Sequence, residues 1–160
     1  MVPENVAEQW LHRHWEKSPY GYIPSRLYRF DLEEWPSERL CEIRTNQTDF
    51  AADNASERDF GRWLIEEERS PLSCRPWLAD FMREKHCFPV PIIVLDNHDM
   101  HFRLLPMVNR SHDDLPAAHI LIEGHRRFAI ALYLRSINAF ANSMRLWIMR
   151  PIQLSPALST

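Results

Sequence analysis

A short run of charged residues around a glycine is the first candidate for chemistry in this chain. Glu123-Gly124-His125-Arg126-Arg127 separates one apolar run from a longer one. A glycine lets the backbone turn sharply and approach an anion, and the free N–H groups of a helix start point at that anion. Cations in a first helical turn oppose the helix dipole unless something negative is bound. The run therefore predicts a phosphate site, with the alternative that both arginines face solvent or pair with Glu123.

A second candidate is a dense group of metal-ligand residue types. Asp96, His98, Asp99 and His101 follow one another within six positions. Carboxylates and imidazoles are ligands suited to Mg²⁺, Mn²⁺ or Zn²⁺. A metal near bound phosphates would support phosphoryl transfer or phosphodiester cleavage. Polar loops also collect His and Asp without any role, so both interpretations stay open.

Apolar runs predict the elements that would position these groups. Short apolar runs predict buried strands over residues 91–95 and 119–123 and a last strand over residues 145–149. Residues 128–137 are apolar nearly all round, which favours a buried helix. Upstream, we expect a helix over about residues 3–17, a short strand over 25–30 and a short helix from Pro36 through Leu40. Two further helices are expected, from Ser56 to Arg69 and from Pro76 to about His86. Ser56 and Asp59 have the spacing of a capping box.

Length and charge limit the class of protein. The chain has 160 residues, which suits one domain with a sizeable core, and a net charge of −3, which argues against non-specific nucleic-acid binding. Nucleic acid stays open as a partner but is not favoured. Residues 31–70 carry 12 acidic and 5 basic side chains, whereas residues 124–160 carry five arginines and no carboxylate. The acidic region 31–70 is a candidate surface for a protein partner.

Several other classes lack support. The three cysteines have no C-x-x-C spacing, so neither a disulfide framework nor a zinc knuckle is expected. No serine stands in a nucleophile-elbow context. The start shows no secretory signal, and no apolar run approaches the roughly 20 residues of a membrane span. We therefore expect a cytoplasmic protein without a membrane partner.

The residues around Gly124 also carry a family resemblance. Ile120 to Leu134 resembles the signature of the ParB/sulfiredoxin superfamily, in which a strand leads to an acidic residue, Gly, polar residues ending in Arg, an aromatic residue and Ala. Here that segment is Glu123-Gly124-His125-Arg126-Arg127-Phe128-Ala129. Upstream, Pro91-Ile92-Ile93-Val94 is similar to the family's Pro-Ile-x-Val strand. The resemblance covers about residues 76–150.

The resemblance implies a fold and a ligand. The fold would be α+β, a single ParB/sulfiredoxin-like domain over 1–160 with a small mixed sheet flanked by helices. Residues 1–75 would form an N-terminal helical part with an acidic insertion, and 76–150 the core. Gly124, His125, Arg126 and Arg127 would line the phosphates of a nucleotide triphosphate or diphosphate, with or without Mg²⁺.

The resemblance also has limits. Glu123 would shape the turn or touch a metal, and Glu123 and His125 are the candidate catalytic groups. His125 stands where sulfiredoxin has its catalytic Cys, so sulfinic-acid reduction is not expected. Three functions stay open: a nucleotide-binding module, a phosphate-chemistry enzyme (a metal-dependent nuclease or small-molecule kinase), and a non-catalytic interaction module.

Overall fold

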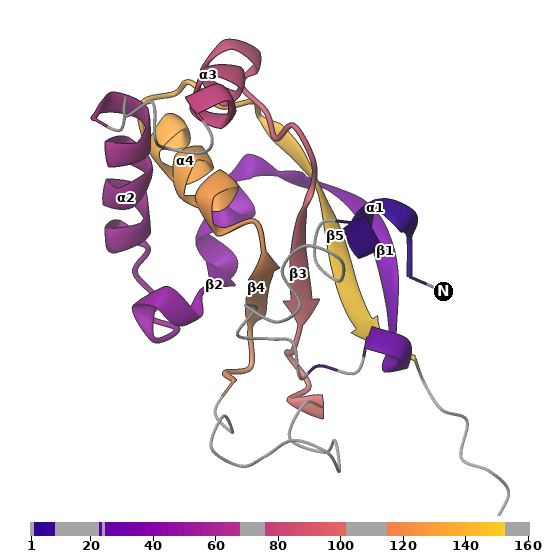
Figure 1. The fold of residues 1–160 in the computed structure, drawn as a ribbon. Coiled ribbons are helices and arrows are strands. Elements are labelled where there is room, and N and C mark those ends of the chain that lie inside the picture. Colours follow the sequence, from indigo (N-terminus) through magenta and orange to yellow (C-terminus); the bar gives the residue numbers. More distant parts are fainter. Residues whose placement is uncertain (1, 9–22, 24, 68–75, 102–114, 153–160) are drawn as a thin grey trace, which may run out of the picture.

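The computed structural model describes residues 2–8, 23, 25–67, 76–101 and 115–152. These residues form a mixed five-stranded sheet with helices packed on it (Figure 1). The strands are β1 (Tyr28–Pro36), β2 (Ile43–Arg44), β3 (Ile92–Asp96), β4 (His119–Glu123) and β5 (Ser143–Pro151). The helices are α1 (Glu4–Val6), α2 (Ala55–Glu66), α3 (Pro76–Lys85) and α4 (His125–Ser136), with 3₁₀ turns η3 (Ser25–Leu27), η4 (Ser37–Glu42) and η5 (Asn46–Thr48). The expected α+β class with a small mixed sheet is confirmed.

The sheet combines distant parts of the chain. Its strand order is β1-β5-β3-β4-β2. β1 runs antiparallel to β5, β5 parallel to β3, β3 antiparallel to β4, and β4 parallel to β2. The N-terminal part of the chain thus supplies two strands, β1 and β2, as well as helices. β2 and β4 end on the same side of the sheet because they are parallel.

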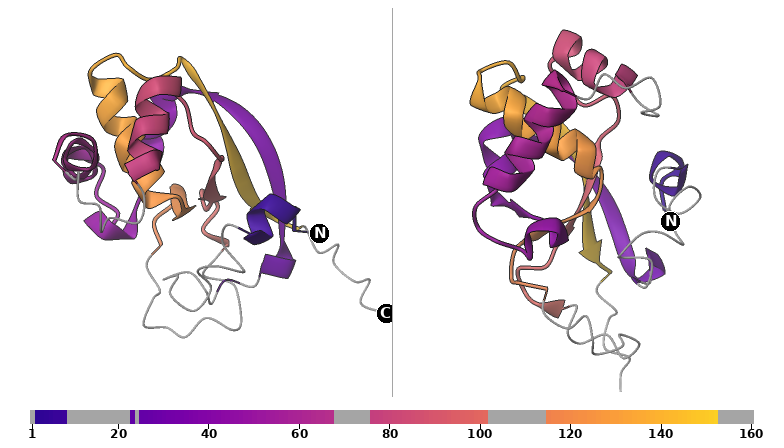
Figure 2. Two further views of the ribbon diagram at one scale, coloured as in Figure 1. Left: turned by 45° about the horizontal axis from the view of Figure 1, so that its top comes forward. Right: turned by 60° about the vertical axis from the view of Figure 1, so that its left-hand side comes forward.

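Alternation along the strands divides the apolar side chains between two faces. Ile92 and Val94 of β3 belong to one buried cluster, and Ile93 and Leu95 to the other. Such continuous apolar strands are typical of a sheet covered on both faces. The first cluster includes residues of α2, α3 and α4, while the second contains Val6 of α1. Figure 2 shows these three helices on one side of the sheet and the N-terminal segment on the other.

Helix α2 packs tightly on α4. A Cβ added to Gly61 of α2 would lie 2.0 Å from the carbonyl oxygen of Ala129 in α4. The two helices can approach each other this closely only because Gly61 has no Cβ atom. The inserted region between β2 and α3 is therefore part of the core, where Leu64 and Ile65 of α2 are buried.

Most predicted elements around Gly124 are confirmed, and several upstream boundaries are wrong. β4 matches residues 119–123, and α3 begins at Pro76 as predicted. The strand predicted over 25–30 is instead a 3₁₀ turn followed by β1, because its pairing with β5 extends the strand to Pro36. Helix α2 begins at Ala55 with Asn54 before it, so Ser56 lies inside the helix and does not cap it. Most of the helix predicted over 3–17, namely residues 9–17, lies outside the described part.

Within the described residues, no helix combines the length and the apolar character needed to cross a bilayer.

Candidate functional site

The turn between β4 and α4 has the backbone that the sequence predicts. Gly124 is the residue before α4 and has a φ of 104°, in the left-handed region that favours glycine. Among the residues that the structure describes, no side chain caps the start of α4, and the first turn of this helix contains no acidic residue. The first N–H groups of a helix have no partner within the helix. The helix start therefore offers donors to an anion.

Arg126 and Arg127 have different environments. Arg126 is exposed and forms no ion pair with the residues that the structure describes. Arg127 folds back over Gly124, where its Nη1 donates to the Val90 carbonyl oxygen at 2.8 Å and its Nη2 lies 3.8 Å from Oε1 of Glu123. The Arg127 side chain is 12% exposed. Arg127 thus holds the turn against the segment before β3, and Arg126 is the arginine available to a ligand.

His125 connects the turn to a loop that the sequence did not link to it. Its Nε2 lies 3.3 Å from Oδ1 of Asn46 in η5. Burial, and then the charge of Arg127, lower the pKa of His125 to about 4. His125 is therefore neutral at pH 7 and acts as a hydrogen-bonding group rather than a cation. The loops that follow the parallel strands β2 and β4 meet at this contact.

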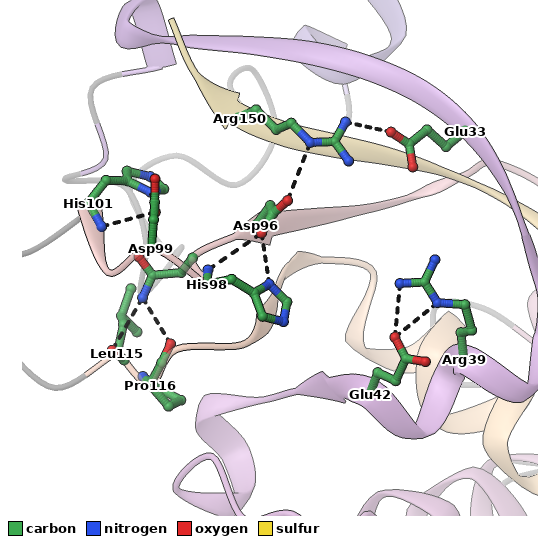
Figure 3. Close-up of polar contacts among 11 residues, drawn as sticks. Glu33, Arg39, Glu42, Asp96, His98, Asp99, His101, Leu115, Pro116 and Arg150 are labelled. Carbon is green, nitrogen blue, oxygen red and sulfur yellow. Dashed lines mark hydrogen bonds and ion pairs between the residues drawn. The ribbon is translucent and has the colours of Figure 1, made fainter. Parts of the chain in front are cut away.

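The Asp and His residues after β3 divide into two groups. Carboxylate or imidazole atoms of Asp96, His98 and His119 all lie within 4.8 Å of one another. Nδ1 of His98 lies 2.8 Å from Oδ1 of Asp96. Figure 3 draws this contact as a dashed line. Asp99 and His101 instead hydrogen-bond to each other. The structure therefore replaces the predicted group of four with Asp96, His98 and His119, hereafter the Asp–His–His cluster.

Antiparallel pairing of β3 with β4 brings this cluster together. Asp96 and His119 are paired residues at the ends of the two strands. The buried Asn97 supports the pairing, because its side-chain amide donates to the carbonyl oxygens of Leu115 and Pro116 at 3.2 and 2.9 Å. His119 itself is 7% exposed, and its ring lies edge-on to that of His98 with 4.4 Å between centroids. Burial, and then the charge of His98, lower the pKa of His119 to about 4.

Arg150 of β5 fixes the carboxylate of Asp96. Its Nε lies 3.3 Å from Oδ2 of Asp96, and its Nη1 contacts Glu33; Figure 3 draws both contacts. The same Nη1 lies 3.1 Å from Oδ2 of Asp31. The hydrogen bond from Arg150 outweighs burial and lowers the pKa of Glu33. Burial alone would raise the pKa of Asp96, but the hydrogen bonds with His98 dominate and lower it. All three carboxylates face the same guanidinium group.

An open depression adjoins the cluster. Its volume is about 540 Å³, and its lining includes Arg29, Asp96, His98, Asp99, Arg150 and Ile152. Two of the three cluster residues, Asp96 and His98, therefore face an accessible space. His119 lies behind them in the sheet.

The Gly124 turn and the Asp–His–His cluster lie at opposite ends of β4. His119 begins the strand and Glu123 ends it, and four residue steps of strand span about 13 Å. A metal ion bound by the cluster would not contact phosphates at the turn. The geometry therefore separates Asp96 and its cluster from the turn, and a role of the cluster in phosphoryl transfer at the turn is not proposed.

The acidic region 31–70 is partly neutralised within the chain. Arg150 pairs with Asp31 and Glu33, and two further pairs are Arg39 with Glu42 at 2.9 Å and Arg135 with Glu38 at 3.7 Å. Glu57 is buried and accepts a hydrogen bond from Thr45 at 2.7 Å. Less negative charge therefore faces solvent than the sequence indicates, and a protein partner on this region stays a prediction.

Three residues of these sites were not predicted. Asn46 lies 79 positions from His125, and no spacing in the sequence relates them. Arg150 lies in β5 (Ser143–Pro151), one residue beyond the strand predicted over 145–149. The sequence does mark His119, because it is a polar residue at the start of an otherwise apolar strand, where its imidazole needs a polar partner.

Comparisons with protein-family models, curated proteins and solved structures found no match. The ParB/sulfiredoxin-like resemblance therefore rests on the sequence of residues 76–150 alone.

Proposed function

We propose that this protein binds the phosphate groups of a nucleotide at the Gly124 turn. The observation that carries the proposal is the left-handed Gly124, which leads into a helix start without a side-chain cap. Backbone N–H groups in this arrangement favour an anion through hydrogen bonds and the helix dipole. The proposal concerns binding and assigns no catalytic step.

The neighbouring side chains have separate roles in this proposal. Arg126, which is exposed, contacts the phosphates directly. Arg127 positions the turn through its bond to the Val90 carbonyl oxygen. Neutral His125 and its partner Asn46 line the side of the site that is nearest to β2. Glu123 is 3.8 Å from Arg127, so we assign it to the shape of the turn rather than to catalysis.

Thermal-shift and calorimetric titrations with CTP, ATP, ADP and GTP, with and without Mg²⁺, test the proposal. A nucleotide at 100 times its Kd stabilises the folded state by about 2.7 kcal/mol, which is readable for a chain of this size. Arg126→Ala should weaken binding at least about tenfold, the effect of losing a charge-assisted hydrogen bond worth about 1.5–3 kcal/mol.

Arg26→Ala is the matched control. Arg26 is also an exposed arginine, but it lies in η3 beside the start of β1, at the opposite end of the sheet. Its replacement should leave nucleotide affinity unchanged. The proposal is wrong if no nucleotide binds, or if Arg126→Ala and Arg26→Ala bind equally well. Absence of any nucleotide binding would favour the interaction-module alternative.

A further inference from the structure

The Asp–His–His cluster at the His119 end of β4 is a second candidate site. It does not depend on nucleotide binding, because it lies about 13 Å from the Gly124 turn along the strand. It consists of the Asp96 carboxylate from β3, the His98 imidazole from the turn after β3 and the His119 imidazole from β4. Two nitrogen ligands and one oxygen ligand suit a borderline divalent ion such as Zn²⁺ better than Mg²⁺.

The buried histidine gives an independent reason to expect a ligand. His119 is 7% exposed, and its Nδ1 has no hydrogen-bond partner among the residues that the structure describes. A buried polar atom without a partner loses its hydration, at a typical cost of about 1–3 kcal/mol. Coordination of a metal ion through this Nδ1 would remove that cost. The neighbours of His119 supply two further ligands within 4.8 Å.

The cluster needs little rearrangement to hold an ion. Ligand atoms around a tetrahedral zinc ion lie roughly 3.3 Å apart, given zinc–nitrogen distances of about 2.0 Å. The ligand atoms lie within 4.8 Å of one another in the structure, so a closing movement of up to about 1.5 Å suffices. His98 can make this shift because its side chain is 55% exposed. Asp96 and His119 are held in place by strand pairing.

The surrounding charge favours a cation. Asp31, Glu33 and Asp96 face the two guanidinium groups of Arg29 and Arg150, which leaves a net charge of −1. Arg150 also orients the Asp96 carboxylate through Oδ2, in the manner of the outer hydrogen bonds that orient metal ligands. From these contacts we infer that Asp96, His98 and His119 form a binding site for a divalent transition-metal ion such as Zn²⁺.

Three protein ligands leave a coordination position for another group. Structural zinc sites are usually closed by four protein ligands, whereas sites with three keep a position for water or a small molecule. Asp96 and His98 line the open depression, so the remaining position would be accessible from solvent.

Titration of the EDTA-treated full-length protein with Co²⁺ tests the inference, since Co²⁺ in a site of nitrogen and oxygen ligands absorbs visible light. We expect saturation at one Co²⁺ per chain, displacement by Zn²⁺ and no displacement by Mg²⁺. His98→Ala should weaken Co²⁺ binding at least about 100-fold, because even outer-shell changes cost 10–100-fold. The exposed position of His98 keeps this variant folded, which circular dichroism would verify.

Asp99→Asn is the control, because Asp99 lines the same depression but lies outside the cluster. It should bind Co²⁺ like the original chain. Absence of stoichiometric binding would overturn the inference, and so would binding that His98→Ala leaves unchanged, since the ion would then occupy other histidines. Neither result would bear on nucleotide binding at Gly124.

Discussion

Gly61 and Ala129 are in direct contact where α2 crosses α4. A Cβ on Gly61 would lie 2.0 Å from the Ala129 oxygen and 2.4 Å from its carbonyl carbon. Both obstructing atoms belong to the backbone of a buried helix, so neither can rotate away. The contact therefore fixes the position of α4 relative to α2. The first turn of α4 forms the candidate phosphate site.

Gly61→Ala should therefore destabilise the protein. Overpacking typically costs about 1–3 kcal/mol, and the higher helix propensity of alanine offsets up to about 1 kcal/mol of that. We expect a net loss of about 1–2 kcal/mol in urea unfolding. Ser56→Ala, at an exposed position of the same helix, should change stability by no more than about 0.5 kcal/mol. A variant at Gly61 that equals or exceeds the original stability would contradict this packing.

Replacement of Arg127 should reduce stability, while replacement of Arg126 should not. Arg127→Ala removes the hydrogen bond to the Val90 carbonyl oxygen and the cation that lies 3.8 Å from the Glu123 carboxylate. A hydrogen bond from a charged group contributes about 1.5–3 kcal/mol. Arg126 is exposed, so Arg126→Ala should lie within about 0.5 kcal/mol of the original chain. Urea denaturation of the two variants side by side measures the contrast, and equal effects would disprove the distinction.

Arg150 should matter more than Arg29, although both contact Asp31. Arg150→Ala would leave Glu33 and Asp96 facing each other without a cation, and the Arg150 side chain is 27% exposed. We expect a loss of about 2–4 kcal/mol, near the range for broken buried pairs. Arg29 is 62% exposed, and loss of an exposed pair costs about 0–1 kcal/mol. Thermal unfolding at low and high salt would distinguish them, and a similar loss in both variants would refute the assignment.

Stability should fall as the solution becomes acidic. The pKa values of His119 and His125 are lowered to about 4 from 6.5, so the unfolded state binds more protons between these values. Each histidine then contributes stability that is complete above about pH 6.5 and lost as pH falls to about 4. The loss is at most about 3 kcal/mol for each group.

Urea unfolding from neutral pH down to about pH 5 measures this slope, since Asp and Glu titrate mainly below that range. His125→Gln removes one of the two titrating groups, so its stability should depend on pH about half as steeply. A flat profile of the original chain across this range would contradict burial of both histidines.

The sequence by itself determined the strand–turn–helix unit around Gly124. An apolar run of five residues, a glycine and a long apolar segment are local signals, and local signals suffice where neighbours in sequence also pack together. The α+β class was expected from the family resemblance around this unit, and the mixed sheet with its helices confirms the class. The helix over 3–17 falls mainly outside the described residues, so that prediction remains one.

Only the tertiary structure decided what the candidate side chains face. Arg127 bonds to Val90, 37 positions away, and His125 meets Asn46, 79 positions away. His119 joins Asp96 because β3 and β4 are antiparallel and paired in that register. Periodicity shows which side of an element is buried, but strand order and register determine which distant residue lies opposite. For that reason the structure groups only two of the four predicted candidates, Asp96 and His98, and adds His119 to them.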